Sequence, residues 1–194
     1  MLFILGVITI AYVVGAIPTG YLLCSWCYGI DITDHGSGNI GASNVARVMG
    51  NKLFPVVFCI DAGKAYATLW LVNLSGYGDA CALYGVALAL LVGNAYSLFI
   101  GFRGGRGVAT AMGIVGFFLP WTSTIGCMVI WIAMLAVTKK PFMASMSAFI
   151  GVMVIHVLMQ TAYVPLLVGI SLWLGWRHSS HLWTWYRTLW TSFD

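Results

Sequence analysis

The chain has 194 residues, of which 61% are hydrophobic and only 7% are charged, and its formal net charge is +4. This composition excludes a water-soluble domain, and a small positive charge carried mainly by loops does not indicate nucleic-acid binding. The length suits about seven membrane spans of ~20 residues each, so we expect one all-α integral membrane domain over residues 1–194.

Hydrophobic stretches follow one another along the chain. The first contains Pro18, which predicts a kink. The fourth is too short to cross a hydrocarbon core of ~30 Å alone. It either joins the fifth through a corner at Pro120 or enters the membrane as a partial helix. The stretches, which predict about seven transmembrane helices, some short or kinked, lie near 2–28, 54–74, 80–100, 108–120, 122–138, 142–159 and 162–176.

The positive charges predict the orientation of these spans. Lys and Arg fall on the first, third and fifth connections and on the tail, whereas the second, fourth and sixth connections carry none. Cytoplasmic loops are enriched in these residues, so we expect the N-terminus outside and the C-terminus in the cytoplasm. The alternation breaks if the fourth stretch does not cross. The cations that define it are Arg47, Lys52, Arg103, Arg106, Lys139, Lys140, Arg177 and Arg187.

The first connection carries the densest polar motif of the chain, residues 36–47. Its Arg47 can bind a phosphate or carboxylate with two parallel hydrogen bonds. A short helix is expected from Ile40, with free N–H groups at its start. The alternative is a polar turn between two membrane helices. Glycines that permit unusual turns, and hydroxyl or amide side chains that bind neutral groups, fill the rest: Gly36, Ser37, Gly38, Asn39, Gly41, Ser43 and Asn44.

One lysine lies inside a predicted span. Lys64 follows Asp61 by three residues, so the two share a helix face and can form an ion pair. A charge within a span costs at least ~2.5 kcal/mol and usually serves a functional site. The alternative is a lysine near the cytoplasmic end whose side chain extends to water.

The third connection combines glycines and arginines just before a helical stretch, over residues 101–110. Arg103 and Arg106, together with N–H groups at the helix start, could bind one anion. The spacing is not that of a Walker loop. The alternative is a positively charged cytoplasmic loop with flexible glycines. The glycines are Gly101, Gly104, Gly105 and Gly107.

Both motifs, Lys64 and the Lys139–Lys140 connection fall on the same predicted face of the membrane. The residues therefore predict binding of a phosphorylated, amphiphilic molecule at the bilayer surface. No metal site and no cofactor are expected, and the sequence does not predict an oligomeric state.

From about residue 15 to residue 145 the chain resembles the bacterial acyl-phosphate:glycerol-3-phosphate acyltransferases, which make lysophosphatidic acid in phospholipid biosynthesis. Residues 36–47 are similar to the family motif G-S-G-N-x-G-[AS]-[TS]-N-x-x-R at every defining position, and residues 61–64 to its D-x-x-K element. Residues 101–110 resemble the motif F-K-G-G-K-G-V-A-T, with Arg103 and Arg106 in place of lysine.

The chain also departs from the family pattern. Asn94 stands where a histidine usually follows Gly93, and of two paired serines only Ser145 remains, with Phe142 at the other position. A third family motif reads approximately R-H-x-x-N-I-x-R-L with a later Gly and Glu. This chain keeps its Arg177 and His178, has His181 at the Asn position, and lacks the later Arg, Gly and Glu. These departures favour, as an alternative to full activity, a non-catalytic or altered-acceptor relative that binds a phosphorylated lipid or polyol phosphate.

The resemblance implies that the 1-hydroxyl of glycerol 3-phosphate attacks the carbonyl of a fatty acyl phosphate in the bacterial inner membrane, with the active site facing the cytoplasm. The residues assigned to binding the acyl-phosphate head group are Ser37, Arg47, Arg106 and Ser145. Lys64 and Arg103 are assigned to binding the phosphate of the acceptor. Catalytic roles are implied for Ser37, Asn44, Arg47 and His178, and substrate binding for Gly36, Gly38, Asn39, Gly41, Lys64, Arg103, Gly104, Gly105, Arg106, Gly107 and Ser145.

The attacking hydroxyl must lose its proton to a general base. His178 is the best side-chain candidate, because Asn94 cannot accept a proton. The family resemblance implies that an oxygen of the acyl phosphate can take the proton instead. We expect His156, in the middle of the sixth stretch, to be a core residue. Residues 176–194 are rich in Trp and predict an interfacial aromatic tail that acts as an anchor or, alternatively, as a lid.

Overall fold

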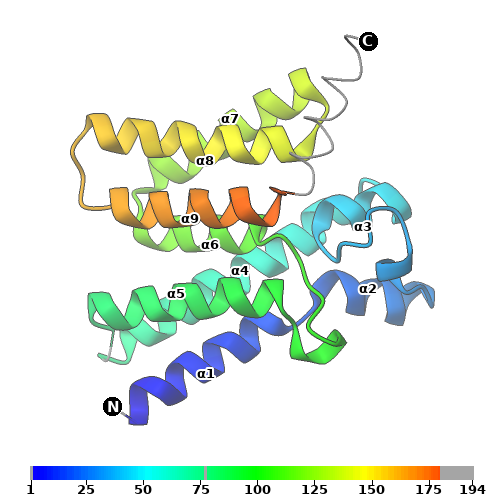
Figure 1. The fold of residues 1–194 in the computed structure, drawn as a ribbon, viewed down its shortest axis with the longest axis horizontal. Helices are drawn as coiled ribbons and strands as arrows, with labels where there is room; N and C mark the ends of the chain where they lie inside the picture. The colour runs from blue at the N-terminus through cyan, green and yellow to red at the C-terminus, as the bar shows by residue number, and fades with distance from the viewer. Residues whose placement is uncertain (1, 77, 180–194) are drawn as a thin grey trace. The chain divides into compact units, whose positions relative to one another are not determined.

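The computed structural model describes residues 2–76 and 78–179, and these are helical throughout, apart from connecting loops (Figure 1). The chain forms two compact units, Met1–Phe118 and Leu119–Asp194. The first contains α1 (Leu2–Ala16), α2 (Thr19–Tyr28), the short 3-10 helix η1 (Ile32–Asp34), α3 (Ala42–Met49), α4 (Leu53–Leu74), α5 (Ala80–Ala95), η2 (Leu98–Ile100) and α6 (Val108–Phe118). The second contains α7 (Trp121–Thr138), α8 (Pro141–Leu158) and α9 (Val164–Arg177).

Two helix pairs form the body of the first unit. α1 packs along α5, and α4 packs along α6. The approach of α1 to α5 is close because Gly93 lies directly against the backbone oxygen of Tyr12, where a Cβ atom would have no room. The predicted short helix after Ile40 is present as α3, which begins at Ala42.

The kink predicted at Pro18 is confirmed. The first hydrophobic stretch divides there into α1 and α2, whose axes differ by 42°. Proline has no backbone N–H and clashes with the preceding turn, so the helix cannot continue through this residue. α2 then ends at Tyr28. The next residue, Gly29, has φ of +65° and donates its N–H to the Ser25 carbonyl, and Ile30 donates to the Cys24 carbonyl.

The α-helix predicted over 80–100 ends at Ala95. The chain then turns, because the Ser97 hydroxyl accepts the N–H of Phe99 at 3.3 Å and starts η2. Gly101 ends η2 in the left-handed conformation. A capping serine and a left-handed glycine therefore turn the end of an apolar stretch into the base of a loop.

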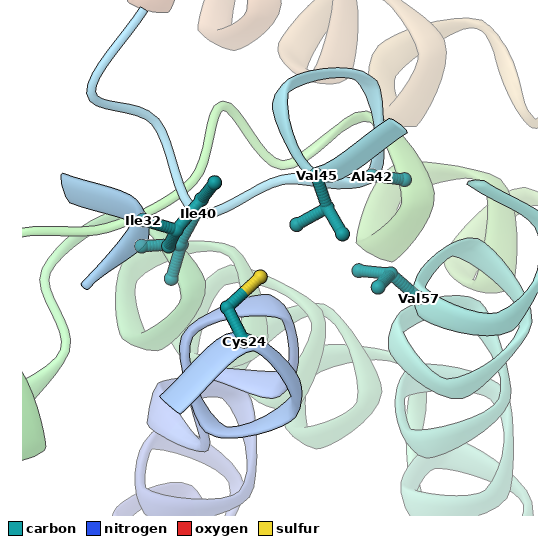
Figure 2. Packing of buried hydrophobic residues seen from close by; sticks show 6 residues of the cluster. All are labelled: Cys24, Ile32, Ile40, Ala42, Val45 and Val57. Atoms are coloured by element: carbon teal, nitrogen blue, oxygen red, sulfur yellow. The ribbon is translucent and has the colours of Figure 1, made fainter. Parts of the chain in front are cut away.

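A small hydrophobic cluster supports the first polar motif. Figure 2 shows side chains that meet from α2, from η1 and the loop after it, from α3 and from α4. Burial of these apolar groups stabilises the loop on the helices at roughly 25 cal/mol per Å². The cluster consists of Cys24, Ile32, Ile40, Ala42, Val45 and Val57, each at most 8% exposed.

In the second unit α8 packs against both α7 and α9. Lys139, in the left-handed conformation, ends α7, and Pro141 begins α8 as a first-turn proline. The prediction that His156 is a core residue is confirmed. It is 4% exposed, and its ring nitrogens lie 3.0 Å from the Ser123 hydroxyl and 2.9 Å from the Thr161 hydroxyl.

Within the described residues, α4, α7 and α8 are long and apolar enough to cross a membrane, and the bent pair α1–α2 is a candidate for a fourth span. α5, α6 and α9 are apolar but shorter. The structure is thus an all-helical one with several candidate spans, and the predicted number of seven crossings stays a prediction. Of the predicted aromatic tail, residues 180–194 lie outside the described part of the chain.

Candidate active site

The side chain of Asn44 lies at the centre of the first motif. Its Oδ1 accepts the N–H of Ser37 at 2.8 Å, and its Nδ2 donates to the backbone oxygen of His35 at 2.9 Å. The same Oδ1 also accepts from Nη1 of Arg47 at 3.2 Å. Asn44 is 2% exposed. A buried amide that joins both ends of the motif in this way determines the path of the loop.

Two of the three glycines of the motif have the unusual conformations that the sequence predicts, and Gly41 does not. Gly36 and Gly38 have φ of +61° and +67°, in the left-handed region. Gly36 also lies so close to Oδ1 of Asn44 that a Cβ atom would collide with it. Gly41 instead has ordinary extended angles and precedes α3, and its N–H donates to Oδ1 of Asn39 at 2.8 Å. Asn39 thereby forms the turn that leads into α3.

Arg47 is exposed, while its Nη1 is held by Asn44. One hydrogen bond to a buried amide restricts the guanidinium without neutralising its charge. The remaining donors of Arg47 can then reach an anion in the solvent or at a membrane surface. Ser37 is exposed beside it.

The second motif folds back onto the end of α5. The N–H of Gly105 donates to the backbone oxygen of Asn94 at 2.8 Å, and Gly104 lies against the backbone oxygen of Ala95 with no room for a Cβ atom. Ser97 and Arg103 form an isolated antiparallel bridge that closes this loop. Asn94 is 6% exposed. It therefore acts here as a platform for the glycines.

Arg103 of the second motif contacts the segment that leads into the first motif. Its Nη1 lies 3.4 Å from the hydroxyl of Thr33, three residues before Gly36. The Thr33 hydroxyl donates to Oδ1 of Asp31 at 2.7 Å. Sequence reasoning missed Thr33. The Asp-x-Thr spacing at 31–33, typical of a helix-capping turn, was the available signal.

Asp31 places a carboxylate next to this contact. Its pKa lies below the ordinary value of 3.8, mainly because the Thr33 hydroxyl and then the Thr33 N–H donate to the carboxylate, with a smaller contribution from the positive charge of Arg103. Asp31 is therefore ionised at neutral pH and helps to hold Arg103 beside the first motif. Arg106, the second arginine of this loop, is half-buried.

The predicted ion pair in α4 is confirmed. Nζ of Lys64 lies 2.8 Å from Oδ1 of Asp61. The same ammonium donates to the backbone oxygen of Ile17 at 2.7 Å, which leaves a third N–H of Lys64 without a partner among the described residues. Asp61 also accepts from the Thr19 hydroxyl at 2.7 Å. Most of the hydrogen-bonding capacity of Lys64 is thus used at the break between α1 and α2.

The remaining candidates, Ser145 and His178, belong to the second unit. The Ser145 hydroxyl accepts from the indole of Trp131 at 3.1 Å and donates to the backbone oxygen of Pro141 at 2.9 Å. His178 is 2% exposed, and its Nδ1 donates to the backbone oxygen of Leu174 at 2.8 Å. The His178 ring packs 5.1 Å from that of Phe142, one turn before Ser145, which places both candidates at one end of the α8–α9 pair.

The sequence pattern of the glycerol-3-phosphate acyltransferase family matches residues 5–186 of this chain. The chain belongs to the glycerol-3-phosphate acyltransferase family. The match extends beyond residues 15–145, over which the motifs alone indicate a resemblance. Family membership confirms both the expected family and the expected enzyme class.

Curated glycerol-3-phosphate acyltransferases are similar over most of the chain. That of Parasynechococcus marenigrum is 34% identical over 178 residues, which cover 90% of this chain and 82% of the relative. That of Geobacter sulfurreducens is 36% identical over 163 residues, covering 84% and 81%. The enzyme of Anaeromyxobacter is 40% identical over 136 residues, or 67% of this chain and 66% of the relative.

The fold is similar to that of a solved acyltransferase of the same family. Two crystal structures of PlsY (YgiH), an integral membrane glycerol 3-phosphate acyltransferase, match with a TM-score of 0.82 and 28% identity over 93% of this chain and 90% of theirs. One is a glycerol 3-phosphate form and the other a lysophosphatidic acid form. This chain is accordingly an integral membrane protein of the glycerol-3-phosphate acyltransferase family.

Proposed function

We propose that this protein transfers a fatty acyl group from acyl phosphate to the 1-hydroxyl of glycerol 3-phosphate, which gives lysophosphatidic acid and inorganic phosphate. The observation that carries the proposal is the contact between Arg103 and Thr33, which joins the second motif to the segment just before the first motif within one unit. The related crystal structures, in glycerol 3-phosphate and lysophosphatidic acid forms, support the same acceptor and product.

In this reaction the hydroxyl oxygen of the acceptor forms a bond to the acyl carbon, and the bond between that carbon and the phosphate oxygen breaks. Negative charge develops on the carbonyl oxygen and on the departing phosphate, so cations and N–H donors stabilise the transition state. Arg47, Arg106 and the Ser37 hydroxyl serve the acyl-phosphate head group. Arg103 and the remaining N–H of Lys64 serve the phosphate of the acceptor.

Asn44 acts as a positioning residue in this scheme, because its amide is occupied by Ser37, His35 and Arg47. It orients the guanidinium of Arg47 and sets the loop geometry on which the Ser37 hydroxyl depends. A misplacement of about 1 Å can lower a rate by about 10²-fold, so such a residue matters without contacting the substrate.

The proton of the attacking hydroxyl needs an acceptor. Asn94 cannot serve, since its amide is not basic and its backbone supports Gly105. An oxygen of the acyl phosphate takes the proton as the bond to phosphate breaks, so that the leaving group departs protonated and the charges balance. His178 is the side-chain alternative that the sequence offers.

We further propose seven crossings of the bacterial inner membrane, with the N-terminus outside and both motifs at the cytoplasmic surface. The distribution of Lys and Arg supports this orientation. The packing of the shorter helices α5, α6 and α9 along α1, α4 and α8 supports their place within the bilayer. In this orientation Ser145 lies shortly after the cytoplasmic connection at 139–140, and His178 lies at the start of the cytoplasmic tail.

The activity test uses the purified full chain with acyl phosphates of several chain lengths and glycerol 3-phosphate. We expect release of phosphate together with lysophosphatidic acid, identified by mass spectrometry. Absence of product with every acyl phosphate would contradict the proposal. Ligand binding without turnover would favour the non-catalytic alternative suggested by Asn94, and turnover only with another polyol phosphate would favour an altered acceptor.

Replacing Arg47 tests the assignment of the anion site. Arg47→Ala should lower kcat/KM at least about 100-fold, because it removes a charge that stabilises the developing anion. The matched control is Lys52→Ala, which removes an exposed cation just beyond the motif and should leave the rate within about twofold of the wild type. Normal activity of Arg47→Ala protein would show that the site lies elsewhere.

A further inference from the structure

The break in the first hydrophobic stretch is joined to distant parts of the first unit by side chains. Where α1 ends at Ala16, the helical hydrogen-bond pattern stops, although the backbone oxygen of Ile17 still accepts the N–H of Thr19 at 3.1 Å. The Ser97 hydroxyl donates to the oxygen of Ala16 at 2.6 Å, and Nζ of Lys64 donates to that of Ile17 at 2.7 Å. A carbonyl without a partner is costly inside a membrane protein, so the Ser97 bond satisfies the Ala16 oxygen, and the Lys64 bond adds a second donor to the Ile17 oxygen.

A second chain of bonds crosses the break from the other side. Thr19, the first residue of α2, donates its hydroxyl to Asp61 at 2.7 Å, and Asp61 in turn holds Lys64 at 2.8 Å. Thr19 and Asp61 are buried, at 8% and 5% exposure. The path from Thr19 through Asp61 and Lys64 to Ile17 therefore closes a ring around Pro18. We name this ring, together with Ser97, the break junction.

The break junction touches both functional motifs. Ser97 is fully buried. Its backbone N–H donates to the backbone oxygen of Arg103 at 3.1 Å, and its backbone oxygen accepts the N–H of Phe102 at 2.8 Å. On the other side, Gly20 follows Thr19 and lies directly against the backbone oxygen of Ile40, with no room for a Cβ atom. A shift of α2 would therefore move the first motif, and a shift of Ser97 would move the second.

We propose that Thr19 and Ser97 are positioning residues for acyl transfer, whose hydroxyls hold the two anion-binding motifs in register through the break junction. The kinetic consequence rests on the proposed function. Neither hydroxyl contacts the substrates in this scheme. Their effect passes through Arg103 and the backbone at Ile40.

The kinetic test uses the full chain and isosteric or near-isosteric variants. Thr19→Val and Ser97→Ala should each lower kcat about tenfold or more per folded molecule, as expected for misplacement of reacting groups by a fraction of an ångström. The conservative variant Thr19→Ser keeps a donor and should recover activity to within about threefold. Rates within twofold of the wild type for folded Thr19→Val and Ser97→Ala protein would overturn the proposal.

Matched controls separate positioning from a general loss of hydroxyls. Thr68→Val removes a hydroxyl bond to the Lys64 carbonyl within α4, and Ser75→Ala removes one to the Val72 carbonyl at its end. Both should leave kcat within about twofold, because neither bond crosses between elements. Losses in these controls equal to those in the junction variants would also overturn the proposal.

The double variant shows whether both hydroxyls act through one junction. If they do, Thr19→Val combined with Ser97→Ala should lose clearly less activity than the product of the two single losses, because the junction is already released by either change. Fully multiplicative losses would mean independent effects and would contradict a shared junction. If Thr19→Val protein does not fold, Ser97→Ala with its rescue by Ser97→Thr decides.

Hydrogen–deuterium exchange supplies a readout that does not depend on activity. Folded Thr19→Val and Ser97→Ala protein should show faster exchange in peptides covering 36–47 and 101–107, while Thr68→Val protein should not. Unchanged exchange in both peptides would overturn the junction. If the wild type lacks acyltransferase activity but both variants still show faster exchange than the wild type, the junction is upheld and only the proposed function is refuted.

Discussion

At the scale of single residues, the buried amide of Asn44 does more than a polar residue in a flexible turn would do. It pairs with a loop N–H, a loop carbonyl and a guanidinium at once. This explains why a loop rich in glycine can hold an arginine in a defined place. The alternative of an unstructured polar turn does not account for an Asn side chain that is 2% exposed.

Replacing Asn44 should therefore reduce both stability and activity. Asn44→Ala leaves the N–H of Ser37 and the carbonyl of His35 without their partner, which should lower the free energy of unfolding by about 1–3 kcal/mol. Thermal unfolding in detergent and the acyl-transfer rate give the two readouts. Asn73→Ala, at an exposed amide near the end of α4, is the control and should change stability by less than about 0.5 kcal/mol. Equal effects of the two changes would contradict the central role of Asn44.

At the scale of elements, the second motif depends on its close approach to the end of α5. Gly104 and Gly105 lie on the backbone of Asn94 and Ala95, so the arginines on either side are positioned by glycines that touch a helix end. This is a packing role, distinct from the flexibility that a glycine-rich loop suggests at first sight. It also explains how an asparagine can occupy the usual histidine position while the loop keeps its platform.

A methyl group at position 104 should displace this loop. Gly104→Ala would place a Cβ atom against the Ala95 oxygen, so the loop must move and the rate of acyl transfer should fall about tenfold or more. Gly126→Ala in α7, where nothing lies within 4 Å of the new Cβ atom, is the matched control and should retain the wild-type rate. Retained activity in Gly104→Ala protein would show that the packing at this glycine does not position Arg103 and Arg106.

At the scale of the whole molecule, a shared anion site requires both motifs to lie on the same side of the membrane. Residues 36–47 and 101–110 belong to the same compact unit and are joined through Arg103 and Thr33. Reporter fusions should therefore place both segments, and the connection at 139–140, in the cytoplasm, with residues 75–79 on the outer side. Fusions that place 36–47 and 101–110 on opposite sides would be incompatible with one shared anion site.

Much of the molecule follows from local properties of the chain. Runs of apolar residues predict the helices, Pro18 predicts the break between α1 and α2, and the spacing of Asp61 and Lys64 predicts their ion pair, because each depends only on residues close in sequence. The first motif likewise indicates the family, which the comparison over residues 5–186 establishes. The hydrophobic run 80–100 does not predict that α5 ends at Ala95, because the contacts at this helix end come from the loop of the second motif, which folds back onto it.

The tertiary structure decided which groups those residues meet. Lys64 donates to a carbonyl 47 positions away and Ser97 to one 81 positions away, and no periodicity or motif encodes such a pairing. Arg103 finds Thr33 only because the helices place both loops at the same end of the unit. The sequence by itself thus determined the chemistry that is available, since side-chain type and helix period are local. The neighbours that orient this chemistry depend on the packing of the whole chain.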